Sequence, residues 1–137
     1  MKLIKKWWKI EEVQKFTPLA RSLLLSTREL FIRGNSLNLQ IKRSKKSPKE
    51  IIELDNQIGE VTRELNEIAN EIRNFGFRVE DPVCAIANFP FFTKDDKGVR
   101  TGLYFNYSPF DVDALGNPII TWRLNYESTK RPLSELK

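Results

Sequence analysis

The apolar residues between positions 47 and 76 follow a spacing that strongly limits what this chain can fold into. They recur at alternating steps of three and four, as in a heptad repeat: Ile51, Leu54, Ile58, Val61, Leu65, Ile68, Ile72 and Phe75. Ser47, Pro48 and Glu50 form a capping-box start, and Gly76 is the residue that commonly ends a helix. The sequence therefore predicts a helix over residues 48–75, about 40 Å long.

Residues 13–41 carry the same spacing, with Thr27 and Gly34 as weak positions where a neighbour can approach closely. Further apolar residues lie beside this seam: Leu19, Leu24, Leu25, Phe31, Ile32 and Leu39. One partner helix cannot cover so wide a face, so we expect contact with the second helix and also with the C-terminal unit or a second copy of the chain. The connection 42–47 is short, which predicts an antiparallel hairpin. Coiled-coil-like packing and two core-facing helices of an ordinary small domain both fit this pattern.

After Gly76 the apolar period changes from helical to alternating. Short strands are predicted at 77–80, 83–89, 103–107 and 120–124, with a turn at 94–98 and a loop at 108–118. Pro90 restricts its strand to an edge or an end. The predicted fold class is α+β: a long antiparallel two-helix, coiled-coil-like hairpin (10–75), a small antiparallel β subdomain (77–126) and a tail (127–137), in a single domain (1–137).

The charge is unevenly distributed along the chain. The net charge is +5, but residues 1–49 contain 13 Lys and Arg against three Glu, whereas residues 50–137 are acidic overall. Opposite charges on facing helices set pairing and register, so much of the basic charge can be used within the protein. The remaining cations at the hairpin loop are candidate phosphate contacts: Lys42, Arg43, Lys45 and Lys46. The alternative is a solvated loop whose charge favours the helix dipole.

Two tryptophans, Trp7 and Trp8, stand among lysines near the N-terminus. Such a mixture can lie at a membrane interface, but the segment is short, so we expect these rings to fold back over the hairpin. No run of about 18 apolar residues is present, which predicts no membrane span and a cytoplasmic location.

The chain lacks the residues of several common active sites. With no histidine and one cysteine (Cys84), it has no Ser-His or Cys-His nucleophile pair, zinc cluster or internal disulfide. No glycine-rich phosphate loop is present. Segment 111–122 differs from a calcium loop because Leu115 and Trp122 stand where oxygen ligands are expected. We therefore expect no cofactor and no metal, and only a carboxylate-based enzyme stays open.

The C-terminal half is rich in large rings, which either form a core against the first helix or leave a patch for a partner. They are Phe89, Phe91, Phe92, Tyr104, Phe105, Tyr107, Phe110, Trp122 and Tyr126. We expect four of them, Phe91, Phe92, Tyr104 and Phe110, to face a protein partner.

Segments 76–81 and 87–90, with 10–13 and 122–124 at corresponding places, resemble domain-of-unknown-function family 2203 of small prokaryotic proteins. The resemblance covers most of the chain through short motifs, and it implies a helical hairpin followed by a glycine-led strand. Two features depart from the family pattern: the Trp-His-Glu stretch expected after 122–124 is missing, and the region 94–118 looks inserted. The family supplies no established activity.

These features favour a non-enzymatic protein–protein interaction module, a dimeric adaptor or assembly factor that docks on a larger protein or enzyme complex. The homodimer would pair two hairpins into a four-helix arrangement. The alternative is nucleic-acid binding through the basic N-terminus and the hairpin loop.

Overall fold

The computed structural model describes residues 7–43, 47–95, 97–125, 127 and 129–136. Two helices precede a five-stranded antiparallel sheet whose strands lie in the order of the chain. The elements are α1 (Ile10–Arg43), α2 (Pro48–Phe75), β1 (Arg78–Asp81), β2 (Ile86–Asp95), β3 (Gly98–Tyr107), β4 (Thr121–Leu124), β5 (Arg131–Pro132) and the 3-10 helix η1 (Leu133–Glu135). The predicted α+β arrangement of a two-helix hairpin and a small antiparallel sheet is confirmed.

The ends of α2 are set by the residues that the sequence indicated. The Ser47 hydroxyl accepts the backbone N–H of Glu50, and Pro48 is the first helical residue. At the other end Gly76 has a left-handed backbone (φ 90°), and its N–H donates to the carbonyls of Ile72 and Arg73. A residue with a side chain is strained in this conformation, so glycine ends the helix here at low cost.

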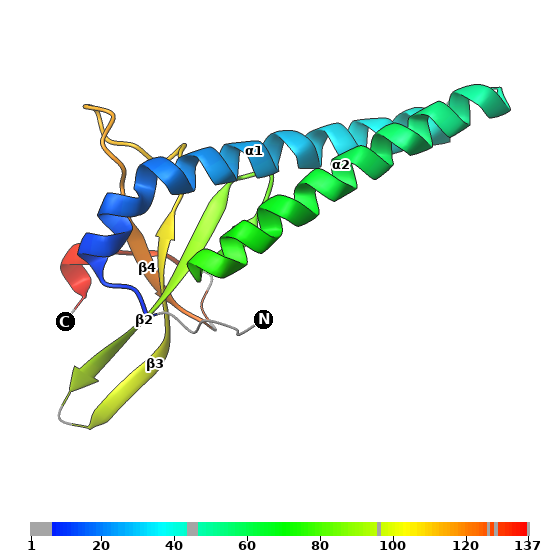
Figure 1. Cartoon of the computed structure of the whole chain (residues 1–137). Coiled ribbons are helices and arrows are strands. Elements are labelled where there is room, and N and C mark those ends of the chain that lie inside the picture. The colour runs from blue at the N-terminus through cyan, green and yellow to red at the C-terminus, as the bar shows by residue number, and fades with distance from the viewer. Residues whose placement is uncertain (1–6, 44–46, 96, 126, 128, 137) are drawn as a thin grey trace.

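The sheet packs its inner face against the N-terminal half of α1, as Figure 1 shows. Alternation along the strands gives this face a row of buried rings and aliphatic side chains: Phe89, Phe91, Leu103, Phe105, Tyr107, Trp122 and Leu124. From α1, Val13, Ala20 and Leu24 join the same core and are fully buried. The expectation that the first helix contacts the C-terminal unit is confirmed.

Trp8 ties the start of α1 to the sheet and to the end of α2. It is buried, its Nε1–H donates to the Gly76 carbonyl at 3.0 Å, and its ring meets Phe16 and Phe89 edge to face. Trp8 therefore folds back onto Phe16 of α1 and the end of α2, as predicted for this ring.

The predicted strand 83–89 starts later and runs further, through Pro90 to Asp95. β1 pairs with β2 only as far as Asn88, so the second half of β2 has an open edge on that side. The Pro90 carbonyl points to this edge and accepts the N–H of Trp8 at 2.8 Å. Because the N and the carbonyl of a strand residue point to the same side, the missing N–H of Pro90 also falls on the open edge, where it costs no ladder bond.

Beyond the sheet the two helices continue as a projecting hairpin (Figure 1). Its own core is small: Leu37, Leu54 and Val61 are buried, and Leu30, Ile41, Ile58 and Leu65 are partly buried around them. Gly34 faces Val61: an added Cβ would lie 3.4 Å from its Cγ1, an ordinary van der Waals contact, so the close approach expected at Gly34 stays a prediction. Among the described residues, neither helix is long and apolar enough to cross a membrane.

Candidate partner-binding surfaces

Phe91, predicted to face a partner, lies in the core instead. Its side chain is 3% exposed, and its ring stacks on Phe105 with centroids 3.9 Å apart. Strand alternation places it with Phe89 on the inner face of the sheet, beneath α1. The assignment of Phe91 to a partner site is therefore wrong, because α1 covers this ring.

The other three predicted partner residues keep exposed surface but have separate neighbours. Phe92 is 41% exposed, and its ring meets Trp7 edge to face. Phe110 is 55% exposed, with the Arg28 guanidinium 5.2 Å from its ring. No ring contact within the described part of the chain joins Phe92, Phe110 and Tyr104 to one another. They do not form one aromatic patch.

Tyr104 is half-buried on the outer face of the sheet, between two arginines. Its hydroxyl accepts a hydrogen bond from Arg78 Nη2 at 2.8 Å. The guanidinium carbons of Arg78 and Arg123 lie 5.1 and 5.4 Å from the ring centroid. Both distances are within cation–π range, so Tyr104 fixes the position of two cations and leaves little ring face for a partner.

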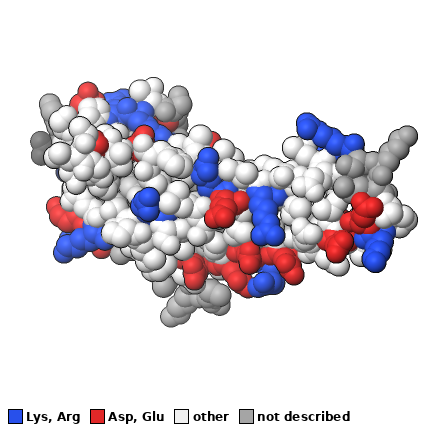
Figure 2. Space-filling model, turned by 90° about the horizontal axis from the view of Figure 1, so that it is seen from above, with Lys and Arg blue, Asp and Glu red and all other residues white. Residues whose placement is uncertain are grey.

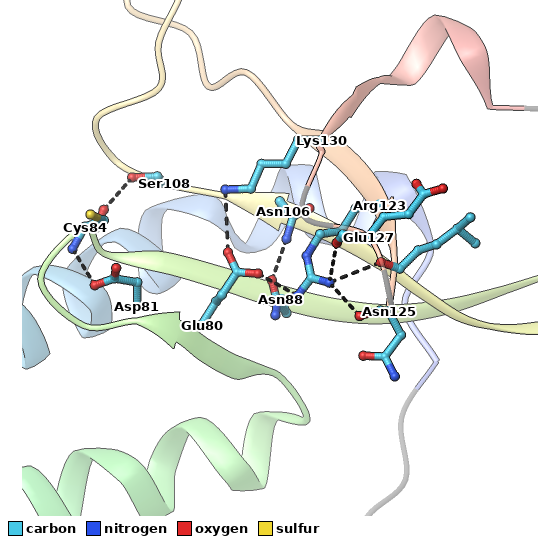
Figure 3. Close-up of polar contacts among 11 residues, drawn as sticks. Glu80, Asp81, Cys84, Asn88, Asn106, Ser108, Arg123, Asn125, Glu127 and Lys130 are labelled. Atoms are coloured by element: carbon cyan, nitrogen blue, oxygen red, sulfur yellow. Dashed lines mark hydrogen bonds and ion pairs between the residues drawn. The ribbon is translucent and has the colours of Figure 1, made fainter.

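Arg123 is the centre of a polar cluster on this outer face (Figure 3). The residue is 8% exposed, its Nη2 pairs with Glu80, and Lys130 lies 3.6 Å from the same carboxylate. Its Nη1 donates to the carbonyls of Leu124, Asn125 and Glu127 at 3.2–3.3 Å. The cluster therefore fastens β1 to β4 and to the chain that follows β4. The buried Nε of Arg123 has no hydrogen-bond partner among the described residues.

Cys84 lies in the turn between β1 and β2, beside the Asp81 carboxylate (Figure 3). Asp81 Oδ1 accepts the N–H groups of Val83 and Cys84 at 2.9 and 3.0 Å, and these bonds lower the pKa of the Asp81 carboxyl. The side-chain hydrogen bond between Cys84 and the Asp81 carboxylate, together with the negative charge of that carboxylate, raises the pKa of the Cys84 thiol. The thiol is therefore protonated at neutral pH and is a poor nucleophile.

The hairpin tip is the predicted phosphate site. Lys42 and Arg43 are exposed in the last turn of α1, and Lys45 and Lys46 lie outside the described residues. Phosphate binding by these four residues stays a prediction.

A first candidate surface is an apolar stripe on α1, formed by the half-buried Leu25 and the exposed Ile32 and Leu39. These residues are spaced by seven, and Ile32 and Leu39 are 41% and 44% exposed. Ile32 and Leu39 each stand two residues after a residue of the hairpin core, Leu30 and Leu37, about 200° further round the helix. The stripe therefore points away from α2. The surplus of apolar residues beside the seam of the first helix indicated this stripe. The sequence alone did not show which of these residues are exposed and which lie in the core.

A second surface is a groove of about 760 Å³ between α2 and β1. Leu65, Ala69 and Arg73 of α2 line one wall, and Arg78 and Val79 of β1 line the other. β1 is an edge strand, so its outer backbone side opens into this space. The volume lies within the range of about 300–1,000 Å³ that is typical of ligand pockets.

Acidic residues gather along one side of the hairpin, with basic residues beside them (Figure 2). One side of α2 carries a row of carboxylates spaced by three, four and seven residues: Glu53, Glu60, Glu64, Glu67 and Glu71. Arg63 pairs with Glu67 within the same helix at 2.7 Å. The acidic second helix expected from the sequence is therefore present as an exposed acidic row.

No family model, curated protein or solved structure matches this chain. The resemblance to domain-of-unknown-function family 2203 stays a prediction.

Proposed function

We propose that this protein is a non-enzymatic protein–protein interaction module that works as a homodimer, with the role of an adaptor or assembly factor for a larger protein. The observation that carries the proposal is the apolar stripe on α1, whose Ile32 and Leu39 are 41% and 44% exposed. Exposed apolar surface in a regular pattern is typical of an interface rather than of scattered surface residues.

The geometry of the stripe favours a second copy of the chain as the partner. Leu25 and Leu39 are both seven residues from Ile32. An antiparallel pair of α1 helices with its two-fold axis at Ile32 would place Leu25 against Leu39 of the partner subunit, and each Ile32 against the other. Such self-complementarity is what a two-fold interface requires. The two hairpins would then form a four-helix arrangement.

A charge placed at the centre of the stripe tests the dimer. Ile32→Asp should convert the dimer to a monomer, because a carboxylate would be buried at the two-fold axis against its own copy. Gln40→Asp is the matched control, since it adds the same charge to an exposed position of α1 outside the stripe. Light scattering coupled to size exclusion at about 100 μM chain gives the mass, and far-UV circular dichroism checks that both variants keep their helices. A monomeric wild-type protein, or an Ile32→Asp dimer, would refute the proposal.

A further inference from the structure

The groove between α2 and β1 combines two features that a bound extended chain needs. The first is the free backbone edge of β1, since no described strand pairs with it on that side. The second is an apolar wall opposite this edge, formed by Leu65 and Ala69 of α2. An added strand gains main-chain hydrogen bonds from the edge and places alternate side chains into the groove.

The charges at the groove are positive. Arg73 and Arg78 line its two walls, and neither forms an ion pair with a carboxylate among the described residues. Arg78 is held by a neutral group, the Tyr104 hydroxyl. The nearby carboxylate of Glu80 is already paired with Arg123 and Lys130. The groove therefore presents two uncompensated guanidinium groups, which bind carboxylates well.

We propose that this groove binds an extended segment of a partner protein in which aliphatic and acidic side chains alternate, as an added strand along β1. The aliphatic side chains lie against Leu65 and Ala69, and the acidic ones, on the opposite face of the added strand, meet Arg78. Arg73, on the wall of Leu65 and Ala69, adds a second positive charge to the groove. β1 has four residues and spans about 13 Å, so the paired region is short and the side chains must supply much of the affinity. The inference goes beyond the proposed homodimer, because the stripe on α1 takes no part in it.

The test is selection from a phage-displayed library of random octapeptides against the full chain. The expected result is enrichment of peptides that alternate Val, Ile or Leu with Asp or Glu. Binding of the best synthetic peptide, measured by calorimetry, should fall at least tenfold with Ala69→Glu, which fills the groove and repels carboxylates. Asn70→Glu adds the same charge to the neighbouring exposed residue outside the groove lining and should leave affinity unchanged.

The backbone part of the inference is tested with two N-methylated forms of the same peptide, methylated at odd or at even positions. In an added strand, alternate N–H groups point toward β1 and away from it, so one form should lose binding and the other should keep it. Loss in both forms would indicate a helical ligand and overturn strand addition. No enrichment, enrichment without acidic residues, or equal binding to Ala69→Glu would overturn the site.

The two proposals fail independently. The monomeric variant Ile32→Asp should bind the selected peptide as the wild-type protein does. If the wild-type protein is monomeric but binds the peptide with the expected pattern, the homodimer is refuted and the groove is supported.

Discussion

Replacement of Trp8 by alanine should destabilise this protein more than any comparable change outside the sheet. The ring is 4% exposed and packs edge to face against Phe16 of α1 and Phe89 of β2. Its indole N–H also satisfies the Gly76 carbonyl at the end of α2. One side chain thus joins both helices to the sheet.

The expected loss in the free energy of unfolding follows from these contacts. Truncation of a buried tryptophan to alanine costs about 3–5 kcal/mol. Trp8→Phe keeps much of the apolar burial but leaves the Gly76 carbonyl without its donor, which costs about 1–2 kcal/mol. Trp7 is the control: it is 36% exposed and meets Phe92 by one edge, so Trp7→Ala should cost about 1 kcal/mol or less.

Urea unfolding followed by far-UV circular dichroism measures the three free energies. With a slope of about 2 kcal/mol per molar urea, Trp8→Ala should lower the midpoint by about 2 M. The order of cost should be Trp8→Ala, then Trp8→Phe, then Trp7→Ala. A Trp8→Ala variant no less stable than Trp7→Ala would show that the N-terminal segment does not hold the fold together, and would refute the reasoning.

Three further predictions concern the outer sheet face, the helix end and the core. Arg123→Met should cost about 3 kcal/mol in thermal or urea unfolding, because it leaves Glu80 without its nearest cation and removes a hydrogen-bond donor from three carbonyls. Glu80→Gln should cost less, about 1 kcal/mol, and the reverse order would contradict the cluster's geometry. Gly76→Ala should cost about 1–2 kcal/mol through its positive φ, and a neutral effect would show that the helix ends elsewhere. Burial raises the pKa of Tyr107, so the folded state keeps a proton that the unfolded state releases. Stability should therefore be independent of this group below pH about 10 and fall as pH rises above it, and Tyr107→Phe should remove that part of the fall.

Local patterns in the sequence predicted the elements well where each depends on neighbouring residues. The capping residues Ser47 and Gly76 and the apolar period between them located α2 correctly. Alternation likewise placed Leu103, Phe105 and Tyr107 on one face of β3. These features follow from backbone hydrogen bonding and side-chain period, which are the same in any tertiary context.

The sequence predicted the candidate surfaces less well than the helices and strands. Phe91 and Phe92 are adjacent and chemically identical, yet one is buried under α1 and the other is 41% exposed. The late start of β2 depended on the turn that Asp81 caps and on the left-handed backbone of Ala85. Neither property can be read from residue type alone.

The sequence by itself therefore determined the two long helices, the caps of the second one, the alternating strands and the lack of histidine-based chemistry. Only the tertiary structure decided which apolar residues are covered, that Trp8 joins helix to sheet, and that β1 is left as an open edge beside α2. The physical reason is that caps and periods are set within a few residues. Burial and strand edges depend on contacts between segments far apart in the chain, such as Trp8 with Gly76 and Glu80 with Arg123.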